Sequence, residues 1–211
     1  MKKELTKRIL SSIILVPMVL FFIIKGSFLF ILFISICFCI IAHEWHIMRK
    51  KKSFYFIGLF FLTFSFFTIY ELRINSGFDY YLLLIIMIIC VATDIGGYFF
   101  GKLFKGPKLT RLSPNKTYAG MIGGYFLSFV FLLFGFKYFD LNFTINWLFI
   151  ILLISSVSQL GDITISYFKR LSKVKDTGKI IPGHGGLLDR VDGMIFAFPF
   201  SYLINLIGIL P

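Results

Sequence analysis

Four aspartates stand out among the ten acidic residues of this 211-residue chain, because they lie within or beside long apolar runs: Asp94, Asp162, Asp189 and Asp192. A carboxylate inside a membrane helix costs about 2.5–3.5 kcal/mol on insertion scales, so it is rare without a partner or a function. Carboxylate oxygens favour Mg²⁺, which typically takes one or two of them together with substrate phosphates. Asp189 and Asp192 share a face if the turn between them is helical. The alternative is that Asp94 and Asp192 only pair with Arg190 or a lysine inside a helix bundle.

Two polar segments near these aspartates contain residues suited to binding phosphate. Residues 182–186, Pro-Gly-His-Gly-Gly, permit positive φ angles and a close approach of backbone N–H groups to a ligand. Residues 113–117, Ser-Pro-Asn-Lys-Thr, offer hydroxyls and an ammonium group where a helix is expected to begin and to attract anions. Neither segment is a Walker sequence, and Gly123-Gly124 predicts only helix packing. Carboxylates beside basic segments therefore predict a site that binds a cation and phosphates together.

Glu44 lies beside another apolar run, in the sequence Ala-His-Glu-Trp-His at 42–46. The two histidines are three residues apart and could share a helix face, but a metal site would need further ligands. We expect this segment to anchor the chain at the membrane interface, with Trp45 in the aromatic belt.

The composition predicts the scaffold that positions these groups. The chain is 58% hydrophobic, 19% aromatic and only 15% charged, whereas an average soluble domain is about 45–50% apolar and about 25% charged. These figures exclude a disordered chain, and three cysteines inside apolar runs exclude a disulfide scaffold. The expected fold is all-α, a polytopic membrane bundle of about seven transmembrane helices. The seven apolar runs are 9–24, 28–42, 54–70, 80–100, 118–136, 143–160 and 191–210.

Basic residues predict the orientation of this bundle. Nineteen of the 22 lysines and arginines fall in four regions, with four before the first run, four after the second, five after the fourth and six before the seventh. An N-terminus in the cytoplasm places all four regions on the cytoplasmic side, as the positive-inside rule expects. The first two runs are short, so we expect a tight hairpin, with a re-entrant pair as the alternative. We divide the single membrane domain into N-terminal helices at 1–92 and a catalytic region at 93–211, with cytoplasmic loops 101–117 and 169–190.

Residues 166–192 read SYFKRLSKVKDTGKIIPGHGGLLDRVD, and this segment closely resembles the signature of the phosphatidate cytidylyltransferases, or CDP-diacylglycerol synthases. The matching positions are Ser166, Lys169, Arg170, Lys175, Asp176, Pro182, His184, Gly185, Gly186, Asp189, Arg190 and Asp192. Segments 93–104, 113–124 and 160–162 and the Glu44-Trp45 pair are also similar to the family, in family order. Two departures are Ile165, where the family usually has Glu, and Gly97, where Ala is usual before Tyr98. The first puts a role for that glutamate in doubt.

The resemblance implies transfer of CMP from CTP to phosphatidate, which gives CDP-diacylglycerol and pyrophosphate in phospholipid biosynthesis. It implies that Asp162 and Asp189 bind a catalytic Mg²⁺ with Asp192 adjacent, and that Lys116 and Lys169 act in catalysis. The residues expected to contact substrate are Ser113, Thr117, Ser166, Arg170, Lys175, Asp176, His184, Gly185, Gly186, Arg190, Asp94 and Tyr98. Phosphatidate is already an anion, so no general base is required, and His184 is expected to orient substrate.

The expected partners are CTP, phosphatidate and the lipid bilayer, with no nucleic acid, and the resemblance allows a homodimer. The expected location is the bacterial inner membrane, with the active site facing the cytoplasm. The alternatives are a related CTP-dependent cytidylyltransferase for another lipid phosphate, a lipid kinase, an inactive relative and a small membrane transporter. A transporter predicts acids spread through the bilayer or paired on both sides, whereas here they crowd beside basic loops.

Overall fold

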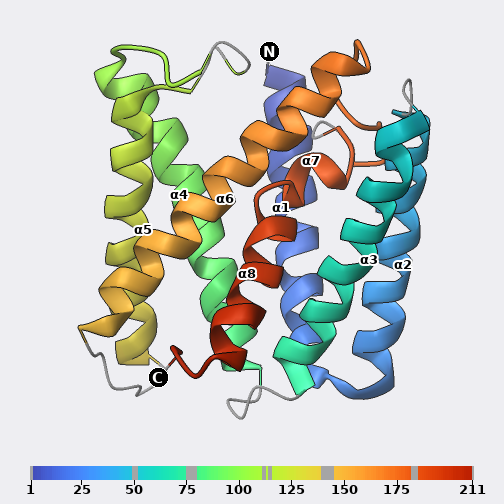
Figure 1. Cartoon of the computed structure of the whole chain (residues 1–211). Coiled ribbons are helices and arrows are strands. Elements are labelled where there is room, and N and C mark those ends of the chain that lie inside the picture. The colour runs from blue at the N-terminus through green and yellow to red at the C-terminus, as the bar shows by residue number, and fades with distance from the viewer. Residues whose placement is uncertain are drawn as a thin grey trace.

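Apolar helices make up most of the structure, as the composition predicts (Figure 1). The computed structural model describes residues 2–48, 52–74, 80–110, 113, 116–138, 145–181 and 185–210. The helices are α1 (Lys2–Lys25), α2 (Ser27–Ile47), α3 (Lys52–Ile74), α4 (Tyr81–Phe104), α5 (Tyr118–Tyr138), α6 (Asn146–Leu171), α7 (Leu188–Val191) and α8 (Met194–Leu206). Extended pairing within the described ranges is limited to two isolated bridges, Lys108 with Thr117 and Ile181 with Gly185. The predicted all-α bundle is confirmed.

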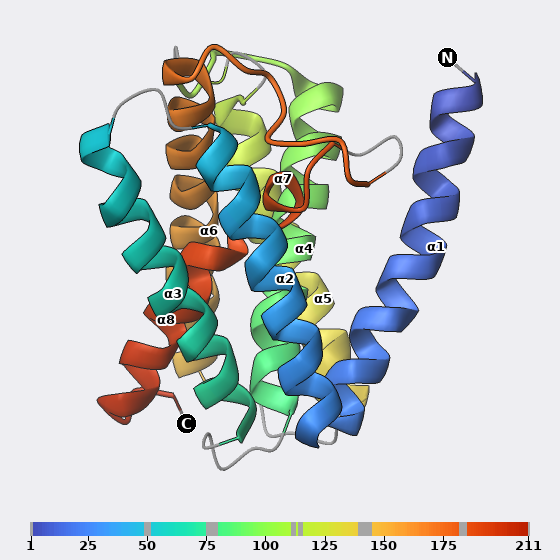
Figure 2. The same ribbon diagram turned by 90° about the vertical axis from the view of Figure 1, so that its right-hand side faces the viewer.

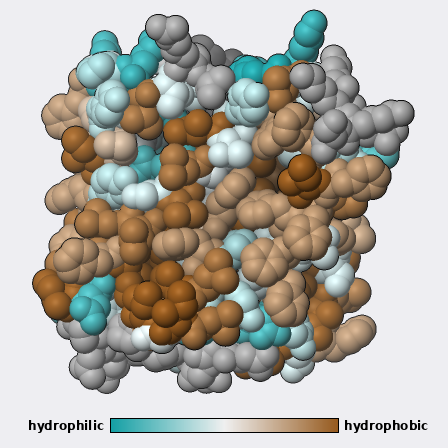
Figure 3. Space-filling view, in the orientation of Figure 1, coloured by the Kyte–Doolittle hydropathy of each residue, from teal (hydrophilic) through white to brown (hydrophobic). Residues whose placement is uncertain are grey.

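Five of these helices, α2 to α6, are long and apolar enough to cross a membrane. The first and last helices contribute shorter apolar stretches, Ile13–Lys25 and Met194–Leu206. Large apolar side chains such as Phe28, Phe56 and Phe60 are more than 70% exposed, and brown apolar surface covers much of the middle of the face in Figure 3. Such surface requires a lipid environment, so the chain is an integral membrane protein. The count of seven crossings and the cytoplasmic N-terminus stay predictions.

The helices alternate in direction, so that several connections gather at one end of the bundle. The start of α1, the end of α4, the start of α5 and the end of α6 lie at the upper end in Figure 1, while the C-terminus lies at the lower end. The first hairpin turns at Gly26, whose φ is 61°. Arg73 of α3 closes this turn, because its Nε donates to the Ile23 carbonyl over 2.7 Å at the end of α1.

Two helix boundaries differ from the sequence prediction in ways that bear on the site. Helix α6 continues to Leu171, well past the predicted end at 160, so the polar residues that follow Leu160 are helical. The last apolar run does not form one helix, because Asp192 and Gly193 make a turn between α7 and α8. Gly193 lies against α6 at this turn, where an added Cβ would approach the Ser158 carbonyl oxygen to 2.8 Å.

Two apolar clusters hold the helices together. The larger cluster joins α4, α6 and α8 around Ile86, Ile154 and Ala197. The smaller one, which we call the Trp45 cluster, consists of Ile41, Trp45, Met48, Leu62, Ile165, Leu188 and Ile195. It ties the end of α2 to α3, α6, α7 and the start of α8, on the side of the bundle where α7 lies (Figure 2).

Helices α4 and α5 pack through their glycines. A Cβ on Gly120 of α5 would lie 2.6 Å from the Gly97 carbonyl oxygen of α4, and a Cβ on Gly124 would lie 3.0 Å from the Thr93 carbonyl oxygen. These backbones approach too closely for larger side chains. The packing role predicted for Gly123-Gly124 is confirmed.

Candidate active site

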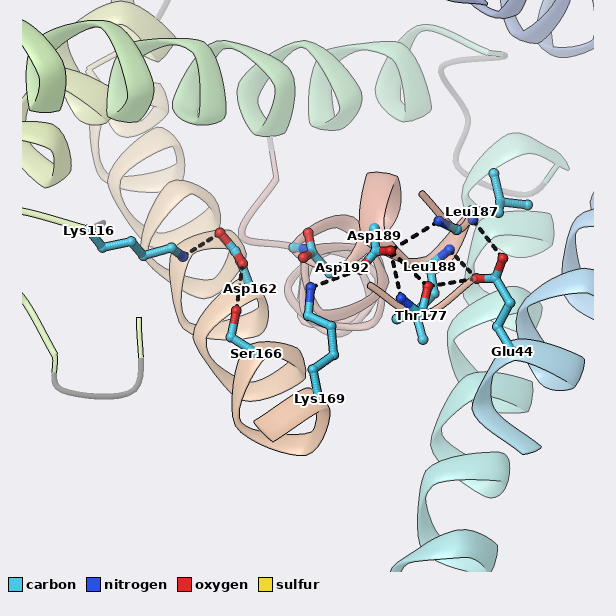
Figure 4. A network of polar contacts seen from close by, with 12 residues as sticks. Glu44, Lys116, Asp162, Ser166, Lys169, Thr177, Leu187, Leu188, Asp189 and Asp192 are labelled. Atoms are coloured by element: carbon cyan, nitrogen blue, oxygen red, sulfur yellow. Dashed lines mark hydrogen bonds and ion pairs between the residues drawn. The ribbon is translucent and has the colours of Figure 1, made fainter. Parts of the chain in front are cut away.

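One face of α6 carries three polar side chains at spacings of four and three residues: Asp162, Ser166 and Lys169. Because these spacings return to the same side of a helix, the three residues lie above one another. Ser166 is buried, and its hydroxyl donates to Asp162 Oδ1 over 3.4 Å. Figure 4 shows this face between Lys116 on one side and the α7 segment on the other.

Lys116 reaches Asp162 from the segment that precedes α5. Its ammonium group pairs with Asp162 Oδ2 and donates to the Gln159 carbonyl over 3.4 Å. Backbone bonds hold this segment in place, including Leu109 N–H to the Lys116 carbonyl at 2.8 Å. Thr117 caps α5, since its Oγ1 accepts the Gly120 N–H over 3.1 Å. The structure therefore brings Lys116 and Asp162 together, as the sequence predicted for the site.

Asp189 of α7 forms the second ion pair, with Lys169. Lys169 Nζ donates to Asp189 Oδ1 over 2.8 Å, and the two side chains are only 11% and 6% exposed. The other carboxylate oxygen accepts the N–H groups of Thr177 at 2.8 Å and Gly186 at 3.0 Å, and the Thr177 hydroxyl lies at 3.1 Å. Both carboxylate oxygens are thus engaged by this chain.

These contacts also set the acidity of Asp189, which lies in α7 outside the spanning helices. Burial alone would raise the pKa of its carboxyl group. The hydrogen bonds from Lys169 and from the Thr177 and Gly186 amides favour the charged form, and together with the lysine charge they lower the pKa below its ordinary value. Asp189 is therefore a permanent carboxylate at neutral pH.

Asp192 and Asp94 extend the acidic cluster around Asp162. Asp192 is buried beside Asp162, and its Oδ1 accepts the N–H of Gly193 over 2.9 Å. Asp94 of α4 lies within electrostatic range of Asp162 and Asp192. The ammonium groups of Lys116 and Lys169 lie on either side of this cluster, so two lysines face three carboxylates.

The carboxylates can be tested for their fit to the predicted Mg²⁺. No group of three or more His, Cys, Asp or Glu side chains in the described part of the chain is arranged to hold a metal ion. Asp162 and Asp192, however, place two carboxylates side by side, and such a pair repels unless a proton or a cation lies between them. Mg²⁺ takes one or two protein carboxylates and completes its shell with substrate phosphates and water. The two residues fit an ion that binds together with a nucleotide.

The other predicted site residues have varied surroundings. The exposed residues are Arg170 at the end of α6, Lys175 and Asp176 on the segment that follows it, and Arg190 in α7. Tyr98 is also exposed, with the Lys102 ammonium 5.7 Å from its ring centroid. Ser113 accepts the Lys116 N–H with its carbonyl oxygen. His184 lies outside the described residues.

Gly185 and Gly186 are required by the site itself. Gly185 has a φ of 86°, and a Cβ there would lie 2.9 Å from Asp189 Oδ2. A Cβ on Gly186 would lie 2.6 Å from Glu44 Oε2, in addition to meeting the Thr177 hydroxyl. The glycines therefore let the backbone approach two carboxylates of this chain, and the Gly186 N–H is used by Asp189.

Sequence reasoning missed Glu44 and Thr177. The expected role of Glu44 as an interfacial anchor is wrong, because its side chain is only 1% exposed. Its carboxylate accepts hydrogen bonds from the Leu187 N–H, the Leu188 N–H and the Thr177 hydroxyl. The similarity of the Glu44-Trp45 pair to the family was the one signal that could have found it.

Ile165 occupies a purely apolar position. Its side chain is 3% exposed and belongs to the Trp45 cluster, together with Leu188 and Ile195. Where the family usually has a polar Glu, this chain therefore has an apolar Ile165, which packs with Leu188 of α7.

Comparisons with known proteins show which family this chain is similar to. Residues 50–207 match the Cytidylyltransferase family. The chain is 34% identical over 196 residues to proteins named phosphatidate cytidylyltransferase from Brucella suis biovar 1 (strain 1330) and Brucella melitensis biotype 1, and the alignments cover 92% of this chain and 72% of each relative. It is 40% identical over 155 residues to the phosphatidate cytidylyltransferase of Staphylococcus aureus (strain COL), which covers 72% of this chain and 55% of that relative.

Proposed function

The chain belongs to the cytidylyltransferase family, and we propose that it transfers CMP from CTP to phosphatidate, forming CDP-diacylglycerol and pyrophosphate. Family membership makes it a CTP-dependent nucleotidyltransferase, and the names of its relatives point to the lipid substrate. The observation that supports the proposal most directly is that two ion pairs, Lys116 with Asp162 and Lys169 with Asp189, lie beside the buried carboxylate of Asp192.

The proposed reaction is an in-line displacement at phosphorus. A phosphate oxygen of phosphatidate attacks the α-phosphorus of CTP, and a new P–O bond forms there. The bond from the α-phosphorus to the oxygen shared with the β-phosphate breaks, and its electron pair leaves with pyrophosphate. Because the attacking oxygen is already anionic, no side chain has to remove a proton.

The lysines neutralise and position the phosphates. Such reactions depend on orientation and on stabilising the spread negative charge. Lys116 and Lys169 are each paired with an aspartate in the structure. A bound triphosphate competes with these aspartates for the ammonium groups. Lys116 is the easier of the two to redirect, because its pair with Asp162 is partly exposed.

We assign Mg²⁺ binding to Asp162 and Asp192, on the donor chemistry of their adjoining carboxylates. When bound, the ion would neutralise and orient the triphosphate. Asp189 as a further ligand stays a prediction, since its oxygens already accept hydrogen bonds from Lys169, Thr177 and Gly186.

The proposed location is the bacterial inner membrane, with the site open to the cytoplasm. The segments before α5 and after α6 are rich in lysine and lie at the same end as the start of α1. Basic segments favour the cytoplasmic side, where CTP is available, while phosphatidate arrives within the bilayer. The homodimer stays a prediction.

The test uses the purified chain in detergent with phosphatidate, Mg²⁺ and CTP labelled at either the α- or the γ-phosphorus. A cytidylyltransferase moves the α-label into lipid and releases the γ-label as pyrophosphate. A lipid kinase moves the γ-label into lipid. Formation of CDP-diacylglycerol that depends on both phosphatidate and metal supports the proposal.

The matched control is Asp162→Asn, which keeps the size of the side chain but removes its charge. Its formation of α-labelled lipid should fall on the order of 10³-fold below that of the parent. Absence of α-labelled lipid from the parent chain at every Mg²⁺ concentration, with folded protein present, would refute the proposed function.

A further inference from the structure

The structure assigns a positioning role to Glu44: we infer that its carboxylate holds Thr177, Leu187 and Leu188 against α2, and so places Asp189 and Lys169 for the reaction. This inference rests on the proposed function for its kinetic consequence. Glu44 lies outside the family match at 50–207, and it comes from a helix that contributes no other polar side chain to the site described above.

The contacts of Glu44 join distant parts of the chain. Leu187 N–H donates to Oε1 over 2.9 Å, and Leu188 N–H donates to Oε2 over 2.8 Å. The Thr177 hydroxyl donates to Oε2 over 2.9 Å. One carboxylate therefore holds Thr177 together with the backbone of Leu187 and Leu188, which leads into Asp189 (Figure 4).

The surroundings of Glu44 are shaped for a carboxylate. A Cβ on Gly178 would lie 2.7 Å from Oε1, and a Cβ on Gly186 would lie 2.6 Å from Oε2. Within the described residues no lysine, arginine or histidine forms an ion pair with Glu44, so neutral donors hold it. A buried carboxylate held in this way keeps its hydrogen-bond donors in place, because the loss of any donor would leave the buried negative charge with too few hydrogen bonds.

Thr177 connects Glu44 to Asp189. Its hydroxyl oxygen lies 2.9 Å from Glu44 Oε2 and 3.1 Å from Asp189 Oδ2. A hydroxyl has one hydrogen, so it donates to one carboxylate at a time and keeps both within reach. The Thr177 N–H donates to Asp189 as well. A shift of Glu44 is therefore transmitted to Asp189 through one residue.

The end of α2 is itself fixed relative to α6. The Ser172 hydroxyl donates to the Met48 carbonyl, and the Trp45 ring packs on Phe168 with centroids 5.2 Å apart. Lys169 lies on the same turn of α6 as these partners. Glu44 thus sets the position of Asp189 with respect to the lysine that pairs with it.

The kinetic test is Glu44→Gln, which keeps the shape but offers an N–H₂ group where an acceptor is needed. We expect kcat to fall about 10- to 100-fold, while KM for CTP changes little, since Glu44 is buried and both of its carboxylate oxygens accept hydrogen bonds from this chain. Thr177→Val, which removes the hydroxyl, should lower kcat to a similar extent. Thr177→Ser, which keeps the hydroxyl, should have the parent kcat. The double variant Glu44→Gln with Thr177→Val should be no slower than the slower single variant, because the two residues act as a unit.

His43→Gln is the matched control, because His43 is the exposed neighbour of Glu44 on α2. It should keep the parent kcat. The inference is wrong if Glu44→Gln keeps kcat within about twofold of the parent, or if the loss of kcat equals the loss of folded protein.

A second measurement is independent of activity. Amide hydrogen exchange of the parent and of Glu44→Gln in detergent should differ in the peptides covering 177–188, where exchange becomes at least about tenfold faster. Peptides from α5 should be unchanged. Unchanged exchange at 177–188 overturns the inference even if the enzyme is active, whereas an inactive parent with this exchange pattern overturns only the proposed function.

Discussion

The two ion pairs of the site are built differently, although each joins a lysine to an aspartate. The Lys169–Asp189 pair is nearly inaccessible, and its carboxylate also accepts two backbone N–H groups. The Lys116–Asp162 pair is 23% and 25% exposed, and its carboxylate accepts a long hydrogen bond of 3.4 Å from Ser166 but, among the described residues, none from a backbone N–H. Asp189 is therefore held in one position, whereas Asp162 can exchange its partner for a ligand. Both aspartates were predicted to bind metal, and this difference separates a fixed half of the site from an adaptable half.

The largest effect is expected for Asp189→Asn. The substitution leaves the Lys169 ammonium buried without its counter-charge and turns an amide toward the N–H donors. Removing one partner of a buried pair costs about 3–5 kcal/mol in the free energy of unfolding, and turnover should fall with it. Thermal unfolding in detergent and product formation from labelled CTP measure the two effects.

Asp176→Asn is the control for this substitution, because Asp176 is an exposed aspartate on the segment between α6 and α7. Its free energy of unfolding should stay within about 0.5 kcal/mol of the parent value. If Asp189→Asn unfolds at the parent temperature, Asp189 is not the fixed half of the site.

Asp162→Asn should separate turnover from stability. Turnover should fall on the order of 10³-fold, because the group proposed to bind the cation is lost. The free energy of unfolding should change by less than about 1 kcal/mol, since a partly exposed ion pair contributes little. Mg²⁺ titration of the residual activity tests the assignment further. A loss of stability as large as that of Asp189→Asn would remove the contrast between the two pairs.

Acid should weaken the fixed half through Asp189. Its pKa is lowered in the folded chain, so the carboxylate contributes stability that is fully present above its unfolded pKa of about 3.9 and is lost as the pH falls through the lower folded value. The parent should therefore lose unfolding free energy below about pH 4, and Asp189→Asn should lose less over the same range. Unfolding midpoints measured between neutral and acid pH give both profiles. If the parent and Asp189→Asn lost equal unfolding free energy as the pH fell, Asp189 would not be the group responsible for the loss.

The sequence predicts the adaptable half better than the fixed half. Lys116 and Asp162 belong to segments that resemble the family, and the structure brings them together. The end of α6 was misplaced because Gly161 and Asp162 interrupt the apolar run. Polar residues lower the mean hydropathy of a segment and so make a membrane span look shorter. In α6 the polar residues after Leu160 line one face of a helix that continues to Leu171. Periodicity over 162–169 would have indicated the longer helix.

The fixed half depends on contacts that no local pattern contains. Glu44 and Leu187 are separated by most of the chain, and their hydrogen bond exists only because the segment after α6 folds back onto α2. The charge of Glu44 and its position next to Trp45 favoured a location at the membrane interface. In the structure, the Glu44 carboxylate instead packs against Gly178 and Gly186 inside the protein. The sequence therefore shows that Glu44 is a carboxylate beside an apolar run, but it does not show that this side chain points into the protein.

The smallest effect is expected at Ile165, which lies next to Ser166 of the adaptable half and packs with Leu188 of the fixed half. Ile165→Val removes one methylene from the Trp45 cluster, so the free energy of unfolding should fall by about 0.5–1.5 kcal/mol. Turnover should stay at the parent level, because the side chain faces only apolar neighbours. Ile165→Glu, which introduces the usual family residue, buries a carboxylate among Ile41 and Leu188 and should destabilise the chain much more. A variant Ile165→Glu that is as stable as the parent and turns over faster would show that this position faces the reaction, and the boundary between the two halves would have to be redrawn on α6.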